Sequence, residues 1–158
     1  MKKILTVFFI VLVGLSIVIN NKIQSNYAIA QENELKRRAP IDIPDPSIIT
    51  MQELKDKTKP TLAFFYVDWC GYCKRFMPIY GAVAKKYNDK FNFVVIHCER
   101  VENQELVKKF EITGFPTLFI IDKKINYKFP LSGSVTRDEN SLIKELDSYL
   151  DARKHFTK

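Results

Sequence analysis

The sequence of 158 residues has few cysteines, and this scarcity limits what they can do. Cys70, Cys73 and Cys98 are the three present, so they cannot form a paired disulfide framework without one left over. A chain of this length can also bury enough apolar surface to fold without disulfide cross-links. We therefore interpret the cysteines as chemical groups rather than structural ones.

A basic stripe with interleaved aromatic residues, typical of nucleic-acid-binding proteins, is also lacking. The net charge is +7, but residues 1–30 contain three lysines and no acidic residue, which leaves +4 for the rest. In that remainder lysines alternate with acidic residues, as on solvated helix faces. We therefore expect no nucleic-acid partner. Twelve Phe and seven Tyr argue against a disordered chain, and the length favours one domain with an aromatic-rich core.

The sequence contains a single apolar run of near-spanning length, and it lies at the N-terminus. The positively charged start, with Lys2 and Lys3, precedes a mainly apolar run over residues 4–19, and Ala28-Ile29-Ala30 supplies a small-x-small cleavage site. This three-part pattern is typical of a secretory signal peptide. We predict a signal peptide over residues 1–30 that is cleaved after Ala30.

An uncleaved N-terminal membrane anchor is the alternative, because the apolar run ends some distance before Ala30. In both cases the lysines at the start hold the N-terminus inside, so the domain lies outside the cytoplasmic membrane. The expected location is therefore exported, either periplasmic or extracytoplasmic and membrane-associated.

The remaining chain is predicted to have three parts. Residues 31–49 are polar and then proline-punctuated, with Pro40, Pro44 and Pro46 close together, which predicts an extended arm. Residues 50–154 form the folded domain, and residues 155–158 are a basic tail.

Within the domain the pattern predicts alternating strands and helices. Continuous apolar runs over residues 61–67 and 91–97 predict two buried strands, which are parallel because a helix over residues 70–87 connects them. A helix over residues 102–110 follows, and the short turn after residue 121 makes the strands 117–121 and 125–129 an antiparallel hairpin.

Two capping-box patterns predict helix starts. Thr50–Glu53 predicts a short helix that ends near residue 57, and Thr136–Glu139 predicts a final helix to about residue 152. The fold class is therefore α/β, with a mixed four-stranded central sheet flanked by helices. Its order is βαβαββα with an extra N-terminal helix.

The pair Cys70 and Cys73 sits where the strand 61–67 ends and a helix begins. Unpaired N–H groups and the helix dipole at this position stabilise an anion. Cysteines of CxxC pairs in such places have pKa values of roughly 3.5–7.5, so a thiolate is favoured at position 70. Cys73 lies one turn further in, so Cys70 is predicted to attack and Cys73 to resolve the mixed disulfide.

Zinc binding and a purely structural disulfide are the alternatives for this pair. A structural zinc site needs four ligands, and His97, Cys98 and His155 are the remaining soft ligands. His97 and Cys98 are adjacent at a strand end and point to opposite faces. A disulfide across two residues closes too short a loop to add much stability. We therefore expect no metal and no organic cofactor.

Several elements together resemble the thioredoxin superfamily over about residues 50–152. They are the strand 61–67, the Trp69–Lys74 motif, Pro78 inside the next helix, and Gly114-Phe115-Pro116-Thr117. The resemblance implies a thioredoxin fold, a cis Pro116 against the cysteines, and a Phe115 backbone that pairs with an extended substrate chain. A simple turn proline is the alternative for Pro116.

The residues around the two cysteines are assigned supporting roles. Trp69 and Tyr72 are predicted to form an apolar rim that holds a substrate polypeptide, and Gly71 and Lys74 complete the motif. The pair Gly71-Tyr72 also resembles periplasmic disulfide isomerases. Those proteins carry a separate dimerisation domain, for which residues 31–47 are too few.

The family pattern has one departure, and three nearby residues are expected to be passive. Thioredoxins place a buried Asp where this chain has Phe64. Asp68 and Lys74 are expected to face solvent. His97 is expected to be a satisfied polar residue. Cys98 is interpreted as a strand-end filler, with a regulatory or intermolecular thiol as the alternative.

The predicted function is an extracytoplasmic protein thiol–disulfide oxidoreductase, with a lean towards reduction. Its partners would be proteins or peptides with disulfides or thiols, and a membrane protein that recharges the dithiol. The alternatives are a thioredoxin-fold binding or chaperone module, and a disulfide oxidase or isomerase.

Overall fold

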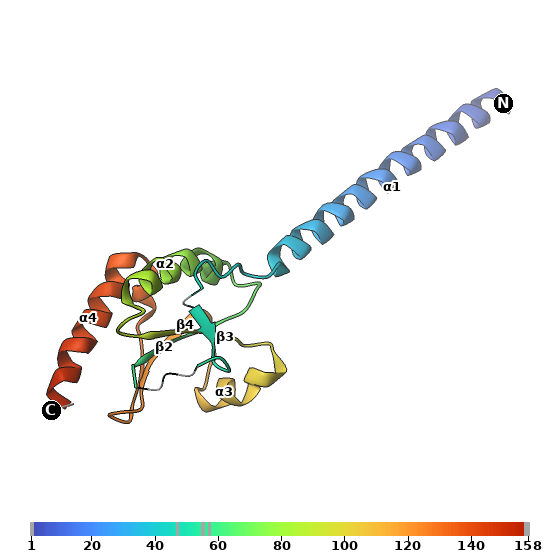
Figure 1. Cartoon of the computed structure of the whole chain (residues 1–158). Coiled ribbons are helices and arrows are strands. Elements are labelled where there is room, and N and C mark those ends of the chain that lie inside the picture. Colours follow the sequence, from blue (N-terminus) through green and yellow to red (C-terminus); the bar gives the residue numbers. More distant parts are fainter. Residues whose placement is uncertain (1, 47, 55, 57, 157–158) are drawn as a thin grey trace. The chain divides into compact units, whose positions relative to one another are not determined.

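The computed structural model describes residues 2–46, 48–54, 56 and 58–156, with side chains from residue 16 onward. It divides into two units, Met1–Ala39 and Pro40–Lys158, which are described separately (Figure 1). The first unit consists of the helix α1 (Lys2–Arg38). Across the described residues, the helices are all too short or too polar to cross a membrane.

The prediction of an extended arm over residues 31–49 is wrong at both ends. Residues 31–38 continue α1, where Glu32 pairs with Lys36 and Glu34 pairs with Arg37 and Arg38 at helical spacing. The prolines that exclude a helix begin only at Pro40. Residues 48 and 49 of the predicted arm lie in a strand instead, Ile48–Thr50.

The second unit is built on a five-stranded mixed sheet, one strand more than predicted. Its strands are β1 (Ile48–Thr50), β2 (Thr61–Tyr66), β3 (Asn92–His97), β4 (Thr117–Asp122) and β5 (Tyr127–Pro130), in the order β1-β3-β2-β4-β5. β3 pairs in parallel with β1 and β2, whereas β4 is antiparallel to β2 and β5. The predicted parallel pair and the predicted hairpin are therefore confirmed.

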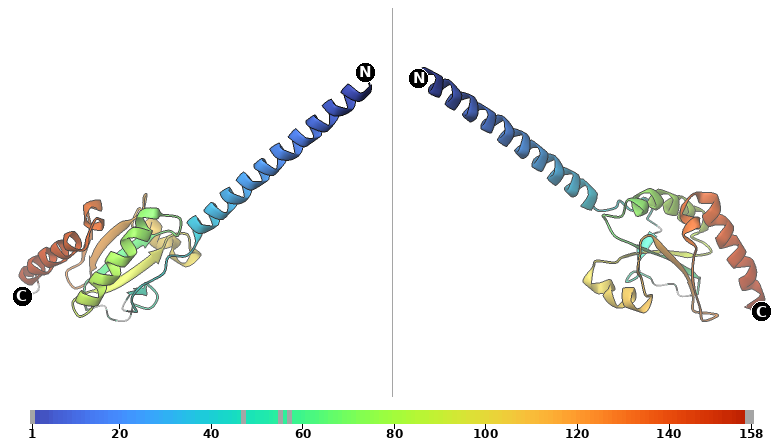
Figure 2. Two further views of the ribbon diagram at one scale, coloured as in Figure 1. Left: turned by 90° about the horizontal axis from the view of Figure 1, so that it is seen from above. Right: turned by 180° about the vertical axis from the view of Figure 1, so that it is seen from behind.

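Three helices cover this sheet. α2 (Gly71–Tyr87) and α4 (Glu139–Phe156) lie together on one face, and α3 (Gln104–Lys109) lies on the other (Figures 1 and 2). Short 3-10 turns at Val101–Asn103 and Gly133–Thr136 precede α3 and α4. The order βαβαββα is present, and α1 is the additional N-terminal helix.

The two capping-box predictions have different outcomes. Thr50 and Glu53 do make the expected side-chain contact, with Glu53 Oε2 2.7 Å from Thr50 Oγ1, but a turn follows β1 and no helix begins there. At the last helix the cap is Asp138, whose Oδ1 accepts the Ser141 N–H at 2.8 Å. The predicted final helix is confirmed, but it begins at Glu139, three residues after Thr136.

Alternation along β2 places aromatic rings on both faces of the sheet. Phe64 packs against Phe76 and Tyr80 of α2, with ring centroids 5.1 and 5.3 Å away. Phe65 packs on the other face against Phe110 and Phe119. All residues of β2 are buried, as expected of a central strand covered on both sides.

Residues 40–46 belong to the second unit and pack against its other elements. The Ile41 N–H donates to Asp68 Oδ1 at 3.0 Å, and Asp45 is buried. A Cβ added to Gly81 of α2 would lie 2.5 Å from Pro44 Cγ, so the glycine permits this close approach. This segment is therefore part of the folded domain.

Candidate dithiol–disulfide site

The helix α2 begins at the predicted reactive pair. Cys70 is its N-cap residue, with extended backbone angles, and its Sγ accepts the Cys73 N–H at 3.1 Å. Cys70 and Cys73 form a disulfide with their Cα atoms 5.2 Å apart. When this bond is reduced, the same N–H and the positive end of the helix dipole face the sulfur of Cys70. This geometry favours a thiolate at position 70.

The two sulfur-bearing residues differ in burial. Cys73 is fully buried, and Cys70 is 6% exposed. The exposed part of the pair is therefore Cys70, which suits attack on or by an incoming sulfur. Cys73 can then reach only the sulfur that Cys70 carries.

Trp69 and Tyr72 are both exposed beside the pair. Trp69 is 41% exposed, its Nε1–H donates to Glu99 Oε1 at 2.8 Å, and its ring meets the Phe115 ring edge-on at 5.9 Å. Tyr72 is 70% exposed, and the Arg75 guanidinium carbon lies 4.5 Å above its ring. These contacts fix two apolar surfaces that a polypeptide could touch.

The peptide bond between Phe115 and Pro116 is cis, as the family resemblance implied. It lies directly before β4, and Thr117 Oγ1 donates to the Gly114 carbonyl at 2.8 Å. Phe115 and Pro116 are both partly buried. Phe115 meets Trp69, and Pro116 shares a groove with Tyr72. The fold thus brings four of the predicted substrate-contacting residues to one place.

That groove has a volume of about 500 Å³ and includes two arginines. It is lined by Tyr72, Arg75, Ile79, Pro116, Gly133, Thr136 and Arg137. Sequence reasoning missed Arg75 and Arg137. Arg75 follows the motif on α2 and could have been noticed, whereas Arg137 comes from a distant loop.

The two remaining motif residues have local backbone roles. Gly71 occupies the first position of α2, and a Cβ added there would lie 3.8 Å from an Arg75 guanidinium nitrogen. The Lys74 N–H donates to the Cys70 carbonyl at 3.1 Å, which continues the first turn of the helix.

The prediction that Asp68 faces solvent is wrong, because its carboxylate pairs with His97. Asp68 Oδ2 lies 2.8 Å from His97 Nε2, and both side chains are largely buried. The Glu99 N–H lies 3.3 Å from His97 Nδ1. The expectation that His97 is a satisfied polar residue is confirmed, and the pair ties the end of β3 to the loop before Cys70.

Cys98 and Phe64 both have buried side chains. Cys98 Sγ contacts the Ile96 carbonyl at 3.6 Å, and burial raises the pKa of its thiol to about 11. It is therefore protonated and unreactive at neutral pH, as a strand-end filler would be. Phe64 is fully enclosed among rings, so an aromatic side chain fills the position where thioredoxins carry a carboxylate.

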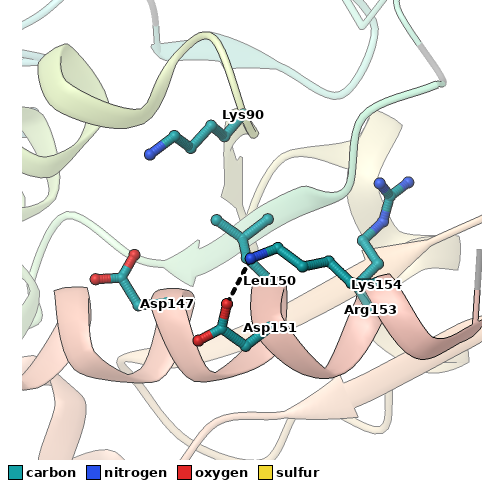
Figure 3. Close-up of a pocket in the computed structure, with 6 residues that line it drawn as sticks. All are labelled: Lys90, Asp147, Leu150, Asp151, Arg153 and Lys154. Carbon is teal, nitrogen blue, oxygen red and sulfur yellow. Dashed lines mark hydrogen bonds and ion pairs between the residues drawn. The ribbon is translucent and has the colours of Figure 1, made fainter.

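Another pocket lies at the other end of the domain (Figure 3). Its lining includes Lys90, which follows α2, and Asp147, Asp151 and Lys154 of α4. Lys154 and Asp151 form an ion pair at 2.8 Å along α4, on the wall of this pocket. Since α2 has 17 residues, about 25 Å of helix separates this pocket from Cys70. It has no part in the chemistry of the disulfide.

A disulfide at the start of a helix, together with a cis proline that opens an antiparallel strand, defines the class of thioredoxin-fold dithiol–disulfide proteins. The family model described as Thioredoxin matches residues 50–148. The chain belongs to this family.

Curated relatives and solved structures agree with this placement. Protein disulfide-isomerase 1 of Dictyostelium discoideum is 35% identical over 92 residues, which cover 56% of this chain and 25% of that protein. Protein disulfide-isomerase A4 of Bos taurus is 31% identical over 106 residues, covering 65% and 15%. The chain thus matches a quarter or less of each of these two proteins.

Among solved structures, an uncharacterised thioredoxin-like protein from Clostridium perfringens has a TM-score of 0.56 at 25% identity, covering 66% of this chain and 81% of that one. The J-Trx1 fragment of ERdj5 has a TM-score of 0.57 at 20% identity, covering 66% and 50%. The second likeness shows the fold alone.

Proposed function

We propose that this protein is an extracytoplasmic protein-disulfide oxidoreductase that works chiefly as a reductase. The observation that carries the proposal is the Cys70–Cys73 disulfide at the N-terminus of α2, with Cys70 as the N-cap. The names of the curated relatives, which are protein disulfide-isomerases, support the same chemistry. Proteins or peptides with disulfides are the proposed substrates.

In the reductive direction the Cys70 thiolate attacks one sulfur of a substrate disulfide. The substrate S–S bond breaks, a mixed disulfide forms, and the leaving substrate sulfur takes up a proton. Cys73 then loses its proton and attacks the Cys70 sulfur, which releases the second substrate thiol. The substrate gains two electrons and two protons, and the protein is left with the Cys70–Cys73 disulfide.

A thiol reductant must return these two electrons after each turnover, and we propose a membrane protein with a dithiol for this role. The reductive direction rests on the thioredoxin-like motif from Trp69 to Lys74. Thioredoxin has a reduction potential of about −270 mV and protein disulfide isomerase about −180 mV. We expect a glutathione titration of the pair to give a value nearer the first.

Disulfide isomerisation is the second candidate, and the names of the curated relatives favour it. Reactivation of scrambled ribonuclease without added reductant separates the two functions. An isomerase restores ribonuclease activity in this assay, whereas a reductase without a donor stops after one stoichiometric reduction.

Turnover of insulin disulfides with dithiothreitol as donor tests the reaction itself. We expect Cys70→Ser to abolish turnover, and pre-reduced Cys73→Ser mixed with insulin after removal of dithiothreitol to accumulate a mixed disulfide because the resolving thiol is gone. Cys98→Ser is the matched control and keeps full activity, since that thiol is buried and protonated. Equal activity of Cys70→Ser and wild type would show a binding module instead of an enzyme.

The extracytoplasmic location is proposed from residues 1–30 and is tested by expression in a bacterial host. The exported protein should begin at Gln31 when its N-terminus is sequenced. An intact N-terminus in the membrane fraction supports the anchor alternative, and accumulation in the cytoplasm contradicts export.

A further inference from the structure

The groove beside the disulfide carries positive charge that the proposed reaction does not require. Arg75 and Arg137 line it together with Tyr72 and Pro116. Among the residues described as lining this groove there is no carboxylate. A polypeptide that enters it therefore meets two guanidinium groups and apolar surface.

Arg75 is held close to the reactive residues. Its guanidinium carbon lies 4.5 Å from the centre of the Tyr72 ring, and one guanidinium nitrogen would lie 3.8 Å from a Cβ on Gly71. The charge therefore sits over the two residues between Cys70 and Cys73. Stacking on the ring leaves the edge of the guanidinium free to donate two hydrogen bonds to a carboxylate.

The carboxylates of Glu99 and Asp68 lie outside the residues that line the groove, and both already have hydrogen-bonding partners. Glu99 accepts the Trp69 indole N–H at 2.8 Å, and Asp68 pairs with His97 at 2.8 Å. The groove residues come from α2, the turn before β4 and the loop before α4. The charged residues that line the groove are thus cationic, and the neighbouring carboxylate of Asp138, next to Arg137, accepts hydrogen bonds from Ser141.

We propose that Arg75 and Arg137 select substrates with an acidic side chain one or two residues from the attacked cysteine. This inference rests on the proposed function and specifies its substrate class. An extended chain advances about 3.3 Å per residue, and the groove begins at Tyr72, between the two cysteines, so a side chain one or two residues from the attacked cysteine is the one placed next to it. The arginines are specificity-determining residues and take no part in the sulfur exchange.

Three synthetic peptides with one intramolecular disulfide test the proposal. They differ only at two positions, two residues before and two residues after one of the cysteines. Both positions are Glu in the first peptide, Gln in the second and Lys in the third. Pre-reduced protein is mixed with each peptide, and formation of the Cys70–Cys73 disulfide is followed by the fluorescence of Trp69, the single tryptophan. We expect the Glu peptide to react about three- to ten-fold faster than the Lys peptide at low salt, and the ratio to shrink at 0.5 M NaCl.

Substitutions in the groove separate specificity from reactivity. Arg75→Gln and Arg137→Gln should each lower the Glu-to-Lys rate ratio, whereas Arg75→Lys should retain most of it. Because loss of Arg75 can change the reactivity of Cys70 towards every peptide, the ratio is the readout and the absolute rate is not. Lys144→Gln, an exposed site on α4 outside the groove, removes the same net charge and should leave the ratio unchanged.

The outcomes distinguish this proposal from the one on which it rests. Equal rates for the three peptides, with a reactive wild-type protein, overturn the acidic preference and leave the oxidoreductase function standing. An equal fall in the ratio for Lys144→Gln and the arginine variants also overturns it, since long-range charge would then explain the effect. Failure of all three peptides to react, and of insulin as well, contradicts the oxidoreductase function itself.

Discussion

A buried carboxylate, Asp122, holds the end of α4 to the sheet, and its replacement gives a quantitative test of the fold. Asp122 is 1% exposed at the end of β4. Its Oδ2 accepts the Tyr149 O–H at 2.7 Å and pairs with the Arg153 Nε–H, and its Oδ1 accepts the Lys124 N–H at 2.9 Å. We predict that Asp122→Asn weakens all of these contacts.

The cost can be worked out from the contacts. Breaking one partner of a fully buried ion pair costs about 3–5 kcal/mol. Arg153 keeps 20% of its side-chain exposure, so water partly replaces the lost carboxylate. The asparagine oxygen can still accept one hydrogen bond, but its NH₂ group then faces donors. We therefore expect a loss of about 2–3 kcal/mol in the free energy of unfolding, measured by urea denaturation at pH 7 under oxidising conditions.

The pH dependence of this difference has a definite sign. Burial raises the pKa of Asp122, but hydrogen bonds from Arg153 and Tyr149 outweigh it and leave the pKa below its ordinary value of 3.8. A carboxyl group whose pKa is lowered by folding stabilises the protein above its unfolded value and loses this effect as the pH falls through the folded value. The gap between wild type and Asp122→Asn should be constant from pH 7 to 5 and shrink below about pH 4.

Asp151→Asn is the matched control on the same helix. Asp151 pairs with Lys154 at 2.8 Å, but both side chains are more than 70% exposed. Exposed pairs contribute about 0.2–1 kcal/mol or nothing measurable. If Asp122→Asn costs no more than Asp151→Asn, Asp122 is not a buried anchor, and the account of how α4 is held would be refuted.

Three further predictions concern residues on and around α2. Tyr80→Phe removes a fully buried hydroxyl that donates to the Leu62 carbonyl at 2.7 Å. We expect it to lower the free energy of unfolding in urea by about 1 kcal/mol, whereas Tyr72→Phe at the surface should leave it unchanged. Glu99→Ala removes the carboxylate that accepts the Trp69 indole N–H. The emission maximum of Trp69 should therefore shift, and insulin turnover should fall a few-fold. An unchanged emission spectrum would contradict this hydrogen bond. In the reduced native protein at pH 7.5, a thiol-alkylating reagent should modify Cys70 first, because the start of α2 favours its thiolate, and should modify Cys98 only after denaturation, because burial raises the pKa of that thiol to about 11.

The parts of this fold that the sequence predicts well are those in which one physical signal dominates. The run over residues 62–67 is apolar without interruption, which is typical of a strand covered on both faces. The cysteine pair was placed correctly because a strand end, the CxxC spacing and a helical pattern coincide there. The cis bond at Pro116 came from the family resemblance and not from the residue itself.

The predictions that failed depended on contacts between distant segments. The three residues of β1 carry a weak local signal, and their partner is β3, more than forty positions away. Thr50 and Glu53 form the local contact of a capping box, but pairing with β3 takes Thr50 into a strand instead. Asp68 was expected to face solvent because nothing near it in sequence binds it, and its partners, Ile41 and His97, lie 27 and 29 positions away.

The packing of Pro44 against Gly81 bears on where this domain can be cut. The family match starts at residue 50, but the folded unit starts at Pro40. A fragment trimmed to the family boundary would lose most of β1, expose the hydrogen-bonding edge of β3, uncover Gly81 on α2, and take the Ile41 N–H away from Asp68, two positions before Cys70. Protein prepared for redox measurements should therefore retain residues 40–49, or aggregation and altered reactivity would be mistaken for properties of the dithiol.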